Sequence, residues 1–167
     1  MSHESTPADK RRTPPGMGRK ATLRLREPSF VPSFNKVTSA SAVIFTEHRE
    51  IVATVDKRGP DFPGGHVQEG EESAAVTVRR ESREEAGAEL RDVKFVLAIE
   101  SDLYGTEPED LTYMVIMTAI ASDLSGIPTE GTRVILTREQ FKNQHVALKR
   151  ELMEHIVDAA YAVCFAE

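Results

Sequence analysis

The chain has 167 residues, of which 40% are hydrophobic and 29% are charged, and its formal net charge is −6. This composition is that of an ordinary soluble globular protein, and the length is enough for one domain with a core that needs no disulfides. The single cysteine, Cys164, excludes an internal disulfide and favours a reducing compartment. No apolar run approaches the ~20 residues needed to cross a bilayer. We therefore expect a soluble, cytoplasmic protein with no membrane-spanning segment.

The charge is distributed unevenly along the chain. Residues 1–36 hold eight Lys or Arg, three acidic residues and five prolines, which predicts a mobile basic arm before a folded domain over residues 37–167. Nucleic-acid binding is disfavoured, because the arm lacks interleaved aromatic residues and the domain is acidic. Alternatively, the arm docks on its own or a partner subunit through Phe30, Val31 and Phe34, so a homodimer stays open.

The domain begins with two β-prone runs, residues 38–47 and 51–55, which are separated by a short polar connection. This spacing predicts a β-hairpin. A polar loop, Asp56–Asp61, then leads to Phe62-Pro63-Gly64-Gly65. Because Pro63 disfavours helix at the residue before it, we expect the chain to enter the glycine pair in an extended conformation.

The stretch from Gly64 to Gly87 combines a glycine-bearing loop with a helix. The two glycines allow backbone dihedrals that other residues avoid and let the main chain approach a ligand closely. Ser73 has the side chain of a helix N-cap. Small residues then recur at helical spacing and predict a narrow inner face: Ala75, Val78, Ser82 and Ala86.

Three carboxylates, those of Glu81, Glu84 and Glu85, project from one patch of this predicted helix because they are three and four positions apart. Such a patch is either a solvated charged face or half of a metal shell. Mg²⁺ prefers oxygen ligands from one or two carboxylates and completes its shell with water and substrate phosphate. The adjacent glycine loop favours the metal interpretation.

At these residues the chain resembles the Nudix box of the Nudix hydrolases, Gly-x5-Glu-x7-Arg-Glu-U-x-Glu-Glu-x-Gly-U, where U is a bulky aliphatic residue. The box would run from Gly65 to Ala88. Seven positions match its polar and glycine residues: Gly65, Glu71, Arg80, Glu81, Glu84, Glu85 and Gly87.

The chain departs from this box in two ways. Eight residues, instead of seven, separate Glu71 from Arg80, and the two U positions are Ser82 and Ala88. An extra residue inside the helix would rotate everything after it by about 100°, whereas an extra residue in the preceding loop costs little. We therefore expect the loop residues 70–73 to absorb the insertion.

The rest of the chain adds strands and a second helical region. Val93–Glu100 and Leu111–Ala121 are β-prone and flank an acidic loop, and Thr132–Leu136 is a further short strand. Thr137 and Gln140 have capping-box spacing, and a long amphipathic helix is expected from Val146 onward. This order predicts an α/β fold with a mixed β-sheet between helices, and it resembles the Nudix-like α/β/α sandwich.

The resemblance implies a Mg²⁺-dependent Nudix pyrophosphohydrolase that cleaves a nucleoside diphosphate linked to another moiety: a nucleotide, a nucleotide sugar or a dinucleoside polyphosphate. Alternatively, the chain is a catalytically inactive Nudix-fold nucleotide-binding or regulatory domain. The implied metal ligands for Mg²⁺ or Mn²⁺ are Glu81, Glu84, Glu85 and the Gly65 carbonyl. We expect Arg80 to orient these carboxylates through ion pairs with Glu71 or Glu84.

The general base and the substrate contacts stay open at this level. The base is either one of the three helix glutamates or an acid of the following loop, where Glu107, Glu109 and Asp110 are candidates. His66, Tyr104 and Glu107 are candidate substrate contacts; alternatively, His66 is a plain loop residue and Tyr104 a plain loop or core residue. Tyr104 lies 16 residues beyond Ala88, a spacing that resembles a subfamily of Nudix enzymes acting on dinucleoside polyphosphates.

Overall fold

A computed structural model describes residues 20–167, so residues 1–19 of the predicted arm lie outside the described part. Its strands form one sheet in the order β1-β6-β7-β2-β3-β4, with β5 also pairing with β2 and β8 with β3. β2 and β7 are parallel and the other pairs are antiparallel, which confirms the predicted mixed sheet. The bounds are β1 (Leu23–Leu25), β2 (Val37–Phe45), β3 (Ile51–Asp56), β4 (Gly59–Asp61), β5 (Gly64–His66), β6 (Glu89–Ser101), β7 (Thr112–Asp123) and β8 (Thr132–Leu136).

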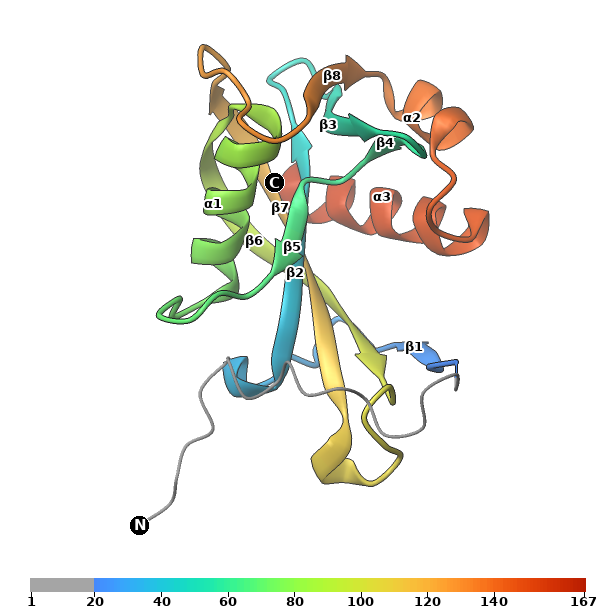
Figure 1. Ribbon diagram of the computed structural model, residues 1–167. Coiled ribbons are helices and arrows are strands. Elements are labelled where there is room, and N and C mark those ends of the chain that lie inside the picture. The colour runs from blue at the N-terminus through green and yellow to red at the C-terminus, as the bar shows by residue number, and fades with distance from the viewer. Residues whose placement is uncertain (1–19) are drawn as a thin grey trace.

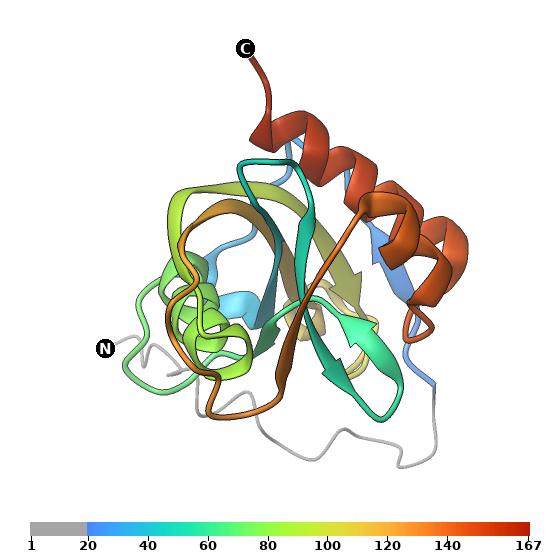
Figure 2. The same cartoon turned by 90° about the horizontal axis from the view of Figure 1, so that it is seen from above.

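Helices cover both faces of the sheet (Figures 1 and 2). α1 (Ala74–Ala86) lies on one face, and α2 (Arg138–Gln144) and α3 (Arg150–Cys164) lie on the other. Two 3-10 turns, η2 (Phe34–Lys36) and η3 (Pro108–Asp110), complete the elements of residues 20–167. None of the helices in this range is both long enough and apolar enough to cross a membrane.

The two faces of β2 supply two separate apolar cores. Val43 and Phe45 belong to the cluster that contains Ile156 of α3. Ala42 and Ile44 belong to the cluster that contains Val78 of α1. Because successive side chains of a strand point to opposite faces, this alternation places the central strand between two helical layers. The α/β/α sandwich predicted from the order of elements is therefore confirmed.

Several local predictions are also confirmed. β2 and β3 form the expected hairpin, and β8 has the predicted bounds. α2 begins with a complete capping box, in which Thr137 Oγ1 accepts from the Gln140 N–H at 3.1 Å and Gln140 Oε1 accepts from the Thr137 N–H at 2.9 Å. These features depend on neighbours in the sequence, which explains why the sequence predicts them well.

Two predictions differ from the structure. The expected polar loop Asp56–Asp61 contains β4, because Gly59 adopts a positive φ of 101° and turns the chain back against β3. The helix expected from Val146 begins at Arg150. The intervening turn is held by the buried His145, whose Nε2 accepts from the Leu148 N–H at 3.1 Å and whose Nδ1 lies 2.9 Å from the Pro60 carbonyl.

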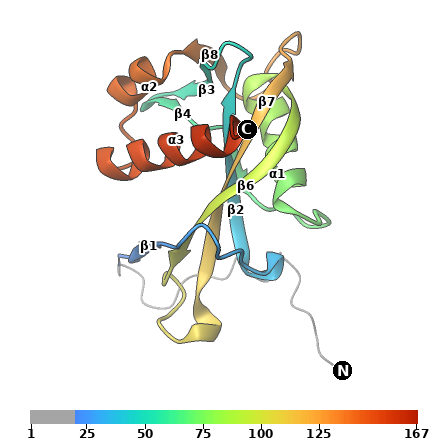
Figure 3. The same ribbon diagram turned by 180° about the vertical axis from the view of Figure 1, so that it is seen from behind.

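The second half of the predicted arm lies on the sheet of its own domain. β1 pairs antiparallel with β6 at the edge of the sheet (Figure 3). Arg26 then donates to Glu100 Oε2 at 2.8 Å and lies over the ring of Phe30, 3.7 Å from its centroid. Phe30 contacts Tyr113 with ring centroids 5.2 Å apart. The structure thus shows Phe30 docked on its own subunit, which is one of the two alternatives that the sequence left open.

Candidate functional site

The helix that carries the carboxylates begins where the sequence predicted. Ser73 is extended, and its hydroxyl accepts from the Val76 N–H at 3.3 Å, so Ala74 is the first helical residue. Gly70 has a φ of 86° in the loop before this cap, and α1 then runs without interruption to Gly87, which ends it with a φ of 59°. The additional residue relative to the Nudix box is therefore accommodated before the helix, and the carboxylates keep their helical register.

The two glycines before the helix lie in strand β5, and neither has a positive φ. The absence of a side chain at these positions lets neighbouring segments approach the β5 backbone closely. The unusual backbone dihedrals that glycine permits were expected here but do not occur. A Cβ at Gly64 would collide with the backbone and side chain of Ser41 on β2. A Cβ at Gly65 would collide with Oε1 of Glu81. The backbone of β5 thus packs directly against the glutamate face of α1.

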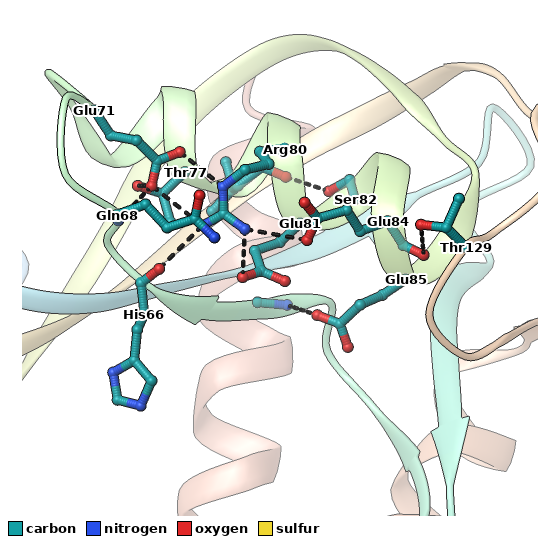
Figure 4. A network of polar contacts seen from close by, with 12 residues as sticks. His66, Gln68, Glu71, Thr77, Arg80, Glu81, Ser82, Glu84, Glu85 and Thr129 are labelled. Atoms are coloured by element: carbon teal, nitrogen blue, oxygen red, sulfur yellow. Dashed lines mark hydrogen bonds and ion pairs between the residues drawn. The ribbon is translucent and has the colours of Figure 1, made fainter.

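Arg80 is the centre of the polar network at this face (Figure 4). Its Nη1 donates to Glu81 Oε1 at 2.9 Å and to Glu84 Oε2 at 3.1 Å. Its Nε and Nη2 donate to the two oxygens of Glu71 at 2.9 and 3.1 Å, and Nη2 also donates to the His66 carbonyl at 3.0 Å. A guanidinium has five N–H groups, and these contacts use all of them. The ion pairs expected between Arg80 and Glu71 or Glu84 are thus both present.

Glu71 is saturated by donors. Besides Arg80, its Oε1 accepts from the Gln68 N–H at 2.7 Å and from the Thr77 hydroxyl at 3.2 Å. Burial raises the pKa of this carboxyl, but the hydrogen bonds from Arg80, the Gln68 N–H and Thr77 outweigh burial, and the pKa is lowered. Glu71 is therefore an ionised anchor for Arg80, and its oxygens are already occupied.

Glu85 has the opposite electrostatic environment. Its Oε1 accepts from the Gly64 N–H at 2.9 Å. The pKa of Glu85 is raised to about 8, chiefly by burial and also by the carboxylates of Glu81 and Asp61, whereas the Gly64 N–H opposes the rise. Asp61 lies at the end of β4 and was not predicted as part of this site. The crowded carboxylates of Glu81 and Glu85 would be stabilised by a cation.

In residues 20–167, no three His, Cys, Asp or Glu side chains come close enough to form a ready metal site. The carboxylates of α1 are engaged in other contacts: Arg80 donates to Glu81 and Glu84, and the Gly64 N–H donates to Glu85 (Figure 4). The donor set nevertheless fits Mg²⁺, which needs only one or two protein carboxylates. Glu81 and Glu85 repel each other beside the backbone of Gly65, and a divalent ion between them would remove that repulsion.

A cavity of about 700 Å³ opens beside Glu81 and Gly65. Of the predicted substrate contacts, His66 and Tyr104 line it, although the ring of His66 points away from Arg80 (Figure 4). Glu107 is not among the lining residues. The neutral polar side chains of the lining are Thr38, Ser39, Gln68, Ser101 and Thr112, and the apolar ones are Val37, Val67, Leu103 and Met114.

The loop between β7 and β8 contacts the carboxyl end of α1, which the sequence did not predict. The Glu84 carbonyl accepts from the Thr129 and Glu130 N–H groups at 2.9 and 2.7 Å. Arg133 Nη1 donates to the Ala86 carbonyl at 2.9 Å and to the Gly126 carbonyl at 3.1 Å. These bonds satisfy carbonyls that a helix leaves open at its end. No signal local to residues 124–133 announces them.

The two small residues at the aliphatic positions of the box are both buried. Ser82 is fully buried, and its hydroxyl donates to the Val78 carbonyl at 2.6 Å, so it leaves no unpaired polar group in the core. Ala88 is 1% exposed and follows the Gly87 cap directly. The substitution by smaller residues is thus accommodated by close packing of α1.

Comparisons with known proteins agree with this geometry. The NUDIX domain family matches residues 35–156. A mutant of the Bacillus subtilis pyrophosphohydrolase BsRppH superposes with a TM-score of 0.69 and 18% identity, covering 88% of this chain and 94% of that one. A NUDIX-family hydrolase from Clostridium perfringens superposes with a TM-score of 0.54 and 16% identity, covering 78% and 99%. No functionally curated protein matched the sequence. Because the NUDIX match spans most of the chain, the protein belongs to the Nudix hydrolase family.

Proposed function

We propose that this Nudix hydrolase is a Mg²⁺-dependent pyrophosphohydrolase that cleaves a nucleoside diphosphate linked to another moiety. The observation that carries the proposal is the joint position of Glu81, Glu85 and the Gly65 backbone, beside a cavity large enough for a small molecule. The carboxylates supply ligands for a hard cation, and the cavity supplies space for the group attached to the diphosphate.

In this proposal Glu81, Glu84, Glu85 and the Gly65 carbonyl would hold Mg²⁺, with Mn²⁺ as a substitute. The ion neutralises charge on phosphoryl oxygens and activates water when it is bound. Arg80 restrains the glutamate side chains, because its Nη1 contacts both Glu81 and Glu84 while its Nε and Nη2 are anchored by Glu71. Arg80 is thus a positioning residue.

The general base is assigned to the helix glutamates in preference to the loop acids. A general base must reach the proton that it abstracts, directly or through one water. Glu107, Glu109 and Asp110 lie outside the cavity lining, whereas Glu81 lines it; Glu85 is also outside the lining but interacts with Glu81 on the same helix. This favours an α1 carboxylate that accepts the proton of the attacking water.

One observation favours the alternative of an inactive binding domain. Arg80 occupies one oxygen each of Glu81 and Glu84, and these ion pairs compete with a metal for the same carboxylates. If the ion pairs with Arg80 are more stable than metal binding to Glu81 and Glu84, the cavity would still bind a nucleotide derivative. Without the metal, no turnover would follow.

A release assay separates the two functions. Nucleotides, nucleotide sugars and dinucleoside polyphosphates would be incubated with the protein in Mg²⁺, in Mn²⁺ and in EDTA, and the phosphate-containing products would be quantified. Metal-dependent release from any of these diphosphates supports the enzyme. Binding detected by calorimetry without release in either metal would establish the inactive domain.

A further inference from the structure

We propose that the cavity beside the carboxylates takes a moiety that carries no further phosphate group. The inference rests on the proposed function and deepens it by naming the substrate class. Substrates would be nucleoside diphosphate derivatives in which the group bound in this cavity, such as the adenosine of NADH or of dephospho-coenzyme A, is neutral and polar. Analogues with one additional phosphate on that group would be excluded.

The first step concerns where the group attached to the diphosphate lies in the cavity. Gly65 pairs with Ala40 on β2, and Ala40 pairs with Val115 on β7. Thr112 lies three residues before Val115 on β7 and pairs with Ser101 on β6. At about 3.3 Å per residue, the Thr112 end of the cavity is therefore displaced from the Gly65 end by about 10 Å along the strand direction. A diphosphate held at the carboxylate end would place its attached group toward this far end.

The second step concerns the chemistry of the far end. Its polar side chains are uncharged hydroxyls, those of Ser101, Thr112 and Tyr104, and Leu103 and Met114 supply apolar contact. Such groups form hydrogen bonds with sugar hydroxyls and with base edges. The ionisable side chains of the lining, apart from Tyr104, are Glu81 and His66, and both belong to the carboxylate end.

The third step concerns the loop that closes this end. Residues 101–110 contribute Leu103 and Tyr104 to the lining, and the same loop contains four acidic residues and no Lys or Arg: Asp102, Glu107, Glu109 and Asp110. The nearby Lys36 is directed at the Glu109 carbonyl, to which its Nζ donates at 2.6 Å. An additional phosphate on the cavity-bound group would therefore approach a negatively charged loop and would find neutral hydrogen-bonding groups in the cavity. Like charges brought together in this way oppose binding.

The test uses pairs of natural diphosphates that differ by one phosphate. NADH is compared with NADPH, and dephospho-coenzyme A with coenzyme A, by measuring kcat/KM in Mg²⁺. In any pair that is cleaved, we expect the member without the extra phosphate to be preferred by at least about tenfold. The preference should shrink as salt is added, because salt screens the repulsion. Equal use, or preference for the phosphorylated member, would overturn the inference.

A substitution in the lining provides a matched control. Thr112→Lys places a cation at the far end, and Thr112→Gln adds a neutral side chain of similar reach. Only the lysine variant should raise the relative use of NADPH and coenzyme A. A parallel change in both variants would mean that size, and not charge, decides between the members of a pair.

Binding separates this inference from the proposed function. The dissociation constants of the same pairs would be measured by calorimetry on the metal-free protein. If no diphosphate is hydrolysed in Mg²⁺ or Mn²⁺, the proposed function fails, while a tighter Kd for NADH and dephospho-coenzyme A would still support the neutral cavity. Failure of both pairs to bind, like equal affinity within each pair, would overturn it.

Discussion

The guanidinium of Arg80 and the carboxylate of Glu71 form a two-point ion pair, with Nε to Oε2 at 2.9 Å and Nη2 to Oε1 at 3.1 Å. The pair connects the loop before α1 to the middle of the helix. Bidentate pairs of this kind fix orientation as well as charge. Arg80 consequently presents its Nη1 group to Glu81 and Glu84 in a defined direction.

The first prediction concerns this geometry. Arg80→Lys keeps the charge but loses the planar fork, so Glu71 and the helix glutamates can no longer be held together. We expect the apparent affinity for Mg²⁺ to fall by about 10- to 100-fold. The Mg²⁺ concentration that gives half-maximal turnover would rise by the same factor. The control is Arg83→Lys on the same helix, because Arg83 is exposed and contacts Glu89 outside the site. An Arg80→Lys variant with the wild-type Mg²⁺ requirement would contradict the positioning role.

The second prediction concerns the proposed ligands. Glu84→Gln and Glu85→Gln should each lower Mg²⁺-dependent turnover by at least about a hundredfold, because each removes a carboxylate ligand. Above the pKa of Glu85, the melting temperature of the metal-free protein should stay unchanged or rise, since each substitution removes a negative charge from a crowded group of carboxylates. Glu89→Gln is the control, because Glu89 is an exposed glutamate just beyond the helix. If either variant retains near wild-type turnover at saturating Mg²⁺, that residue is not a ligand.

The third prediction concerns pH. The pKa of Glu85 is about 8 in the folded protein, above the value of about 4.3 for an unfolded glutamate. A raised pKa in the folded state means that the stability contributed by protonated Glu85 is fully present below about pH 4.3 and is lost as the pH rises from there through about 8. The melting temperature of the EDTA-treated protein should therefore fall over this window, and Glu85→Gln should flatten the fall. An identical slope in the two proteins would argue against this environment for Glu85.

Glu71 contributes with the opposite sign. Its lowered pKa means that its stabilising effect is present at neutral pH and is lost as the pH falls through its folded-state pKa.

Added Mg²⁺ should raise the melting temperature more above the pKa of Glu85 than below it, because metal ligands must be deprotonated. Measurements with and without Mg²⁺ across the same pH series check both statements.

The fourth prediction concerns the N-terminal segment. A chain that begins at Lys20 keeps β1 and serves as the reference. A chain that begins at Asn35 loses Arg26 and leaves the buried Glu100 without its ion-pair partner. We expect it to be less stable by roughly 1–3 kcal/mol, as measured by urea unfolding.

The matched control for this truncation is Glu100→Gln. In the chain that begins at Asn35, the substitution removes the unpaired charge and should recover part of the lost stability. In the full chain, the same substitution should be destabilising, because Arg26 then loses its carboxylate. Equal stability of the chain that begins at Lys20 and the chain that begins at Asn35 would show that the Arg26–Glu100 pair does not attach the segment to the domain.

The sequence by itself determined the features that depend on neighbours along the chain. Ser73 caps α1, Thr137 and Gln140 cap α2, and Glu81, Glu84 and Glu85 share one helix face because their spacing is three and four residues. The order of strands and helices likewise predicted an α/β/α sandwich, and the two cores on either side of β2 confirm it.

Only the tertiary structure decided which distant residues meet. Gly65 is a glycine because Glu81 Oε1 occupies the space of its Cβ, and Asp61 influences Glu85 because β4 folds back on β3. Arg133 binds the end of α1 from β8, 47 residues beyond Ala86. Arg26 likewise reaches Glu100 across 74 residues. These contacts arise from packing between elements far apart in the chain, and such packing leaves no periodicity or spacing in either local segment.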